Sequence, residues 1–193
     1  MDLSRELHPA LTVIHAGPVY SNQNFFQKVP RALVLTTRPS TIFEDELRDN
    51  RRGVDMLPAL LESHNPIDYV ILMLGTNDCK TYYNASAGLI GKGIEKLIAQ
   101  IKSYNSELGI LLMSPIVLGD EVWKPENDPE FNKTSVKTSH KLKDVYKKIA
   151  KKYGCHFLAA SDAASYSDDD MEHMDAIGHR HLADAILNLG LFN

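Results

Sequence analysis

Along most of this chain, stretches in which apolar residues recur at a helical spacing alternate with short runs of consecutive apolar residues. Four stretches repeat apolar residues every three or four positions, which predicts amphipathic helices. Short apolar runs separate them, and a near-continuous apolar run is typical of a strand buried on both faces. The predicted helices span 54–63, 86–104, 133–153 and 175–189, and the predicted strands span 11–16, 67–74, 108–116 and 156–159.

Single residues support several of these boundaries. Ser86 and Asp175 precede helical stretches and suit the N-cap position. Gly154 and Gly190 follow helical stretches, where a glycine commonly ends a helix.

Alternation of strand and helix predicts an α/β fold, namely a three-layer α/β/α sandwich with a central parallel sheet. The length of 193 residues predicts one domain, 1–193. Ligands of such sheets bind beyond the carboxyl ends of the strands. We therefore expect a functional site where the loops 75–84 and 161–174 meet.

Composition narrows the class of protein. Hydrophobic residues at 44% and charged residues at 24% are ordinary for a globular domain, and a net charge of −4 predicts no nucleic-acid partner. No apolar stretch is long enough to span a membrane, and the first residues do not resemble a signal peptide, so we expect a cytoplasmic protein. The two cysteines, Cys79 and Cys155, have no metal-binding spacing.

The loop after the second of these buried strands begins Gly75-Thr76-Asn77-Asp78. Gly75 permits a sharp turn, and the neutral amide of Asn77 could donate a hydrogen bond to a developing oxyanion. The alternative is ordinary turn chemistry, since glycine, asparagine and aspartate are favoured in turns.

The loop before the last helix carries a second candidate. Asp170 precedes His173 by three residues, so its carboxylate could orient the imidazole and leave the other ring nitrogen free as a base. Two alternatives remain at this point: a solvated acidic loop with Asp175 as N-cap, or a divalent-metal site. The ligands of such a metal site would be Asp168, Asp170, Glu172, His173 and His179.

Together these motifs resemble the SGNH (GDSL-type) hydrolase family, specifically its arylesterase-like branch. The resemblance rests on GTND after an apolar strand, on Asp-x-x-His before a C-terminal helix, and on the stretch 51–68, and it covers roughly residues 40–190. It implies a three-layer fold of the SGNH-hydrolase or flavodoxin-like type. It also implies hydrolysis of short acyl esters through a Ser/His/Asp acyl-enzyme, without metal or other cofactor. By this resemblance His173 is the general base, Asp170 orients it, Asn77 is an oxyanion donor and Gly75 shapes its turn.

Residues 1–39 depart from the family pattern. The sequence contains no Gly-Asp-Ser motif, which carries the family's nucleophilic serine. Ser4, in a scrambled form of the motif, and Ser21, just past the first predicted strand, are the candidates. Arg38, or Thr37, stands where the family has an oxyanion glycine. Three explanations are open: a misassigned start or reading frame, a homologue that binds acyl or carbohydrate ligands without turnover, or an unconventional nucleophile.

Two further features have ordinary explanations. Seven lysines fall between residues 137 and 152, which predicts the solvated face of a helix rather than a nucleic-acid patch. Trp123 could line a substrate pocket or pack under its long loop.

The expected partner is a small-molecule ester, and the sequence leaves assembly into a homo-oligomer open.

Overall fold

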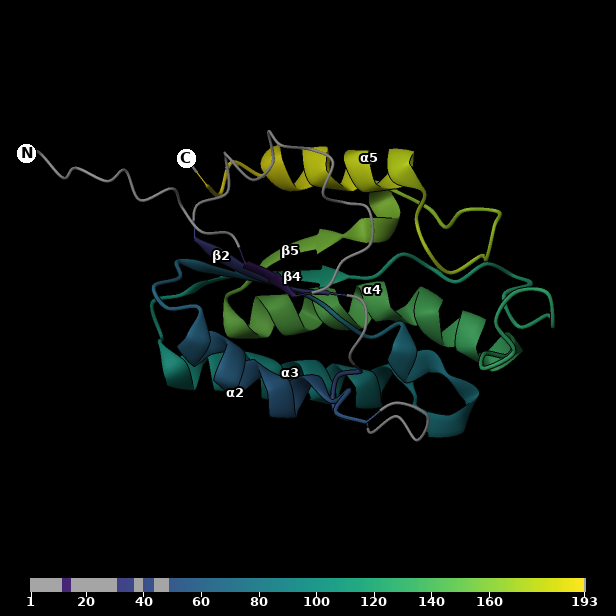
Figure 1. The fold of residues 1–193 in the computed structure, drawn as a ribbon, viewed down its shortest axis with the longest axis horizontal. Helices are drawn as coiled ribbons and strands as arrows, with labels where there is room; N and C mark the ends of the chain where they lie inside the picture. The colour runs from purple at the N-terminus through teal and green to yellow at the C-terminus, as the bar shows by residue number, and fades with distance from the viewer. Residues whose placement is uncertain (1–11, 15–30, 37–39, 44–48, 193) are drawn as a thin grey trace, which may run out of the picture.

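The computed structural model describes residues 12–14, 31–36, 40–43 and 49–192. A five-stranded sheet lies between helices on its two sides (Figure 1). The strands are β1 (Thr12–Ile14), β2 (Ala32–Thr36), β3 (Tyr69–Met73), β4 (Gly109–Ser114) and β5 (His156–Ala159). The helices are α2 (Gly53–Ser63), α3 (Ala87–Tyr104), α4 (Lys133–Tyr153) and α5 (Ala176–Leu187), with short 3-10 turns η2 (Asn77–Cys79), η3 (Thr81–Tyr83) and η4 (Ala160–Asp162).

All strand pairings in the described sheet are parallel, and the strands follow one another in chain order. Each crossover from β2 to β5 therefore moves the chain one strand in the same direction. Because such crossovers are right-handed, α2, α3 and α4 share one face of the sheet. After β5 the chain turns to the other face, where α5 lies (Figure 1). The predicted three-layer α/β/α class is confirmed. The described sheet has the strand order 1-2-3-4-5, whereas flavodoxin-like sheets have the order 2-1-3-4-5.

Alternate residues of the central strands supply two separate cores. Leu72 of β3 and Leu112 of β4 pack in the larger core, beneath α2, α3 and α4. Their neighbours Ile71 and Leu111 face the other way and pack in the smaller core, which includes Leu182 of α5. Both faces are apolar because both are covered, as the near-continuous apolar runs of the sequence predict.

Local capping explains where the helices begin and end. Asn132 accepts hydrogen bonds from the backbone of the first turn of α4 in a capping box, and Gly154 ends that helix in the left-handed conformation. Ser86 and Asp175 cap α3 and α5 through their side chains, as expected. The last helix ends at Leu187, two residues before its predicted end, with Asn188 as C-cap.

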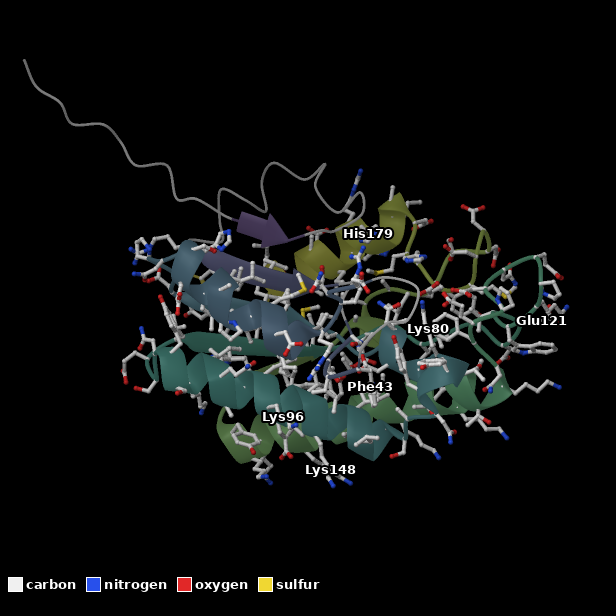
Figure 2. The ribbon with its side chains drawn as sticks, turned by 60° about the horizontal axis from the view of Figure 1, so that its bottom comes forward. Phe43, Lys80, Lys96, Glu121, Lys148 and His179 are labelled. Carbon is white, nitrogen blue, oxygen red and sulfur yellow. The ribbon has the colours of Figure 1, made fainter. Side chains whose placement is uncertain are left out.

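Most of the lysines of α4 lie on its exposed face, away from the sheet. Figure 2 shows Lys148 of α4 and Lys96 of α3 pointing outward from this helical layer. Two lysines of α4 form surface ion pairs, Lys143 with Asp162 and Lys152 with Glu95. None of the described helices is long and apolar enough to cross a membrane.

Candidate functional site

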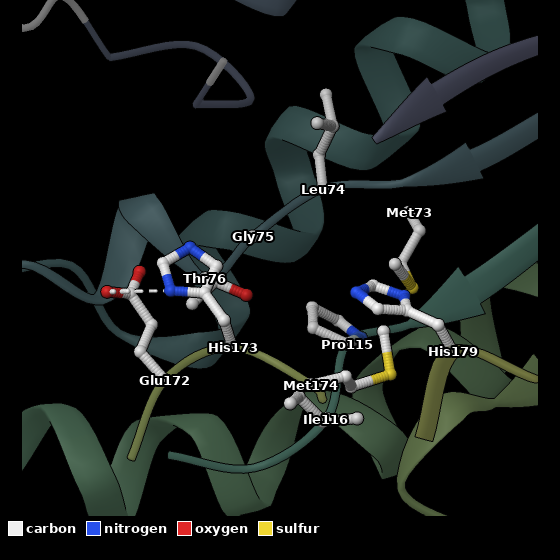
Figure 3. Close-up of a pocket in the computed structure, with 10 residues that line it drawn as sticks. All are labelled: Met73, Leu74, Gly75, Thr76, Pro115, Ile116, Glu172, His173, Met174 and His179. Carbon is white, nitrogen blue, oxygen red and sulfur yellow. Dashed lines mark ion pairs between the residues drawn. The ribbon is translucent and has the colours of Figure 1, made fainter. Parts of the chain in front are cut away.

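The loop after β3 and the loop before α5 meet at the carboxyl edge of the sheet and enclose a pocket (Figure 3). Parallel strands present their carboxyl ends at one edge, which is why segments far apart in the sequence converge here. Residues from β3, from the segment after β4, from the loop before α5 and from α5 itself line it: Met73, Leu74, Gly75, Thr76, Pro115, Ile116, Glu172, His173, Met174 and His179.

Asp170 and His173 form a direct hydrogen-bonded pair at this pocket. The Oδ2 atom of Asp170 lies 2.7 Å from Nδ1 of His173. Its other oxygen, Oδ1, accepts the backbone N–H groups of Glu172 and His173, each at 2.8 Å. These backbone bonds hold the carboxylate in place, so that Oδ2 remains for the imidazole.

The electrostatics of the pair favour an ionised Asp170. Partial burial opposes its ionisation, but the backbone N–H groups of His173 and Glu172, with the His173 side chain, outweigh burial and lower the pKa of Asp170. A carboxylate beside Nδ1 favours the tautomer that carries its proton there. Nε2 is then an acceptor, and because the His173 side chain is 64% exposed, a substrate hydroxyl can reach the ring.

Gly75 occupies a backbone conformation that suits glycine alone. Its φ is +130°, and a Cβ atom at this position would overlap the hydroxyl of Tyr146. That buried hydroxyl donates a hydrogen bond of 2.7 Å to the carbonyl of Leu74. Tyr146 of α4 therefore holds the turn after β3 in place. The sequence predicted the turn but not the tyrosine that requires the glycine.

Asn77 is placed next to the pocket rather than in its wall. Gly75 and Thr76 line the pocket, and Asn77 follows them as the half-buried first residue of η2.

Asp78 is a buried carboxylate whose role the sequence analysis missed. Both of its oxygens accept the backbone N–H of Thr41, at 2.9 and 3.0 Å, and Oδ1 also accepts the Thr41 hydroxyl at 2.6 Å. Burial outweighs these hydrogen bonds and raises the pKa of Asp78 from 3.8 to about 6. The pair ties the segment around Thr41 to the end of β3. Only its place beside Asn77 in the GTND motif marks it in the sequence.

Glu172 and His179 also line the pocket, where the sequence suggested them only as metal ligands. The Glu172 side chain is 12% exposed, and its Oε2 atom lies 3.9 Å from Nδ1 of His173. Burial raises the pKa of Glu172. His179 is buried on α5, across the pocket from His173 (Figure 3). Within the described part of the chain, no group of three His, Cys, Asp or Glu side chains is arranged to hold a metal ion.

The predicted nucleophile candidates, Ser4 and Ser21, lie outside the described residues, as do Thr37 and Arg38. Trp123 is not among the residues that line the pocket. It packs partly buried against the larger core, donates from Nε1 to the carbonyl of Asp120 at 2.9 Å, and stacks under Lys133. Packing under its loop is thus the interpretation that the structure supports.

Comparisons with known proteins show which family the chain resembles as a whole. The model of the GDSL-like lipase/acylhydrolase family matches residues 14–186. An inhibitor-bound aryl esterase from M. smegmatis is 26% identical with a TM-score of 0.71, over 80% of this chain and 74% of that chain. A carbohydrate acetylesterase from Sinorhizobium meliloti is 29% identical with a TM-score of 0.72, over the same shares. No curated protein sequence matches the chain significantly.

Proposed function

The chain belongs to the GDSL-like lipase/acylhydrolase family, a family of ester hydrolases, and we propose that it cleaves short acyl esters through a Ser/His/Asp acyl-enzyme mechanism. The observation that carries the proposal is the 2.7 Å contact between Asp170 and Nδ1 of His173 at the edge of a pocket. In such a pair the histidine is the general base and the carboxylate orients it.

The proposed reaction has two halves. In the first, Nε2 of His173 takes the proton of a serine hydroxyl while the serine oxygen attacks the ester carbonyl. The alcohol leaves with the proton that His173 returns to it, and the acyl group stays on the serine. In the second half, His173 takes a proton from the water that attacks the acyl-enzyme. It then gives this proton to the serine oxygen as the acyl–oxygen bond breaks and the acid is released. Asp170 stabilises the imidazolium in both halves.

Asn77 and the turn at Gly75 have the role of stabilising negative charge on the carbonyl oxygen. An amide N–H is a neutral donor, so it keeps its hydrogen bond at any pH at which His173 is a base. The position of Asn77 directly after two pocket residues supports this assignment.

A preference for short acyl groups has two supports. Part of the pocket wall is apolar, with Met73, Ile116 and Met174 among its residues, and this part suits the alkyl portion of a small acyl group. The Sinorhizobium protein to which the chain is similar is a carbohydrate acetylesterase, and acetyl is a short acyl group.

Hydrolysis of p-nitrophenyl acetate tests the role of His173. We expect the His173→Ala variant to lose about 10³-fold or more of kcat, because the proposed general base is then missing. His181→Ala is a matched control, since His181 is exposed on α5. Equal turnover by the His173→Ala variant and the control would contradict the mechanism.

Labelling with a fluorophosphonate, followed by peptide mapping, tests the nucleophile. We propose Ser4 or Ser21 as the labelled residue. A label on a different serine would replace both candidates, and absence of labelling would contradict a serine mechanism for this chain.

The missing Gly-Asp-Ser motif favours one second candidate, a homologue that binds acyl or carbohydrate ligands without turnover. It predicts ligand binding that survives His173→Ala, together with no acyl-enzyme by mass spectrometry. Turnover that disappears in His173→Ala would refute it.

A further inference from the structure

His179 places a buried imidazole in the wall of the pocket. It is the fourth residue of α5, its backbone N–H bonds to the carbonyl of Asp175, and it is only 7% exposed. Figure 3 shows its ring on the opposite side of the pocket from His173, with an edge directed into the space between them. The mechanism proposed above gives this side chain no task.

One nitrogen of this ring lacks a hydrogen-bond partner in the part of the chain that the structure describes. Nδ1 of His179 is buried and has no hydrogen-bond partner among the described residues. A buried N–H without an acceptor is rarer and more costly than a buried lone pair without a donor. The favoured tautomer therefore leaves Nδ1 bare and puts the proton on Nε2, at the edge of the ring away from the backbone.

The surroundings of His179 also keep the ring uncharged. Burial lowers its pKa, and the positive charge of a protonated His173 lowers it further, while Asp175 raises it less than burial lowers it. The first turn of a helix is an unfavourable place for a cation as well. His179 therefore presents a neutral N–H donor to the pocket.

The two histidines lie on opposite sides of the pocket, and we assign the alcohol of the ester to the side of His173 and its acyl group to the side of His179. His173 returns a proton to the leaving alcohol, so the alcohol must lie beside this exposed residue. The acyl group then extends toward the buried side, where Ile116 and Met174 supply apolar walls and His179 supplies a donor.

We propose that His179 is a specificity-determining residue that donates a hydrogen bond from Nε2 to an oxygen within the acyl chain. The preferred substrates are then esters of 2-alkoxy or 2-hydroxy acids rather than of plain alkyl acids. This proposal rests on the proposed esterase function. A site with a buried donor discriminates against an isostere that lacks the acceptor, because the donor is then left unpaired.

Two esters of equal size test the preference, p-nitrophenyl methoxyacetate and p-nitrophenyl butyrate, which differ by one oxygen in place of a CH₂ group. The quantity to compare is the ratio of kcat/KM for the two esters, because the change in this ratio between variants cancels their different intrinsic reactivity. We expect His179→Leu to lower the ratio about tenfold, and His179→Gln, which keeps a side-chain N–H, to restore most of it.

Two outcomes of the kinetic test count against the proposal. An unchanged ratio in His179→Leu overturns it, and so does a His179→Gln variant that behaves like His179→Leu while both variants retain the circular dichroism of the parent. His181→Leu, at an exposed position of the same helix, is the matched control and is expected to keep the parent ratio.

Nitrogen-15 NMR of the histidine side chains gives a readout that does not depend on turnover. We expect His179 in its Nε2–H tautomer at neutral pH, with a shift of its Nε2 resonance on addition of methoxyacetamide and none on addition of butyramide. An Nδ1–H tautomer, or equal shifts with the two amides, overturns the proposal. If the NMR result holds but no ester is hydrolysed, the proposed function fails while the donor assignment stands.

Discussion

Asp78 offers the sharpest test of the physical reasoning, because two effects of opposite sign act on one carboxylate. The side chain is 0% exposed, and removal from water disfavours its charged form. The hydrogen bonds from the backbone N–H and hydroxyl of Thr41 favour the charged form. Burial wins in the structure and raises the pKa from 3.8 to about 6.

A raised pKa in the folded state makes stability depend on pH with a definite sign. The folded protein binds this proton more tightly than the unfolded chain, so the stabilisation by protonated Asp78 is complete below about pH 3.8. It is lost as the pH rises through about 6. At about 1.4 kcal/mol per pKa unit, the full loss is about 3 kcal/mol.

The Asp78→Asn variant removes this titration while it keeps the size of the side chain and one acceptor oxygen. The free energy of unfolding is measured in urea for parent and variant at several pH values. Between about pH 4 and about pH 7.5 we expect the parent to lose about 2 to 3 kcal/mol relative to the variant. The Asp184→Asn variant, altered at an exposed carboxylate of α5, is expected to run parallel to the parent.

The sign of the result decides between the two effects. A parent that gains stability relative to Asp78→Asn as the pH rises would mean that the hydrogen bonds from Thr41 outweigh burial. A constant difference across the range would mean that Asp78 keeps one protonation state throughout. Either result would refute the balance described above.

Three other predictions follow from the geometry of the site. Asp170→Asn is expected to lower kcat for p-nitrophenyl acetate by up to about 10⁴-fold, because an amide N–H facing Nδ1 favours the wrong tautomer of His173; near-parental turnover would contradict the role of Asp170. Gly75→Ala is expected to cost about 2 to 4 kcal/mol in urea unfolding, since φ of +130° and the Tyr146 hydroxyl both exclude a methyl group; a loss below about 0.5 kcal/mol would show that the turn relaxes freely. Tyr146→Phe is expected to lower the free energy of unfolding by about 1 to 3 kcal/mol, because the Leu74 carbonyl loses its donor. It should also reduce the further cost of Gly75→Ala, so strictly additive effects in the double variant would argue against contact between the two positions.

Features that depend on neighbours in the sequence could be predicted well. The helix of residues 133–153 has its predicted bounds because its start and end are set locally, by the capping box at Asn132 and the left-handed Gly154. The contact of Asp170 with His173 spans three residues within one loop, so spacing alone suggested it. The apolar runs also indicated strands that are covered on both faces, because burial on both faces removes the alternation of apolar and polar residues.

Features that depend on how distant segments meet were decided by the tertiary structure. The hydrogen bonds between Asp78 and Thr41 join residues 37 positions apart. The requirement for glycine at position 75 comes from Tyr146, which lies on α4, far along the sequence. The sequence suggested His179 only as a possible metal ligand, and its burial in the pocket wall, with Nδ1 left without a partner among the described residues, became visible only in the tertiary structure. Local pattern fixes backbone conformation through short-range sterics and capping, whereas burial and pairing depend on which strands lie side by side. The sequence by itself thus determined the four helices, four of the five strands of the described sheet, the layers and the Asp170–His173 pair. The tertiary structure added β2, and the packing of the sheet edge decided the shape and chemistry of the pocket.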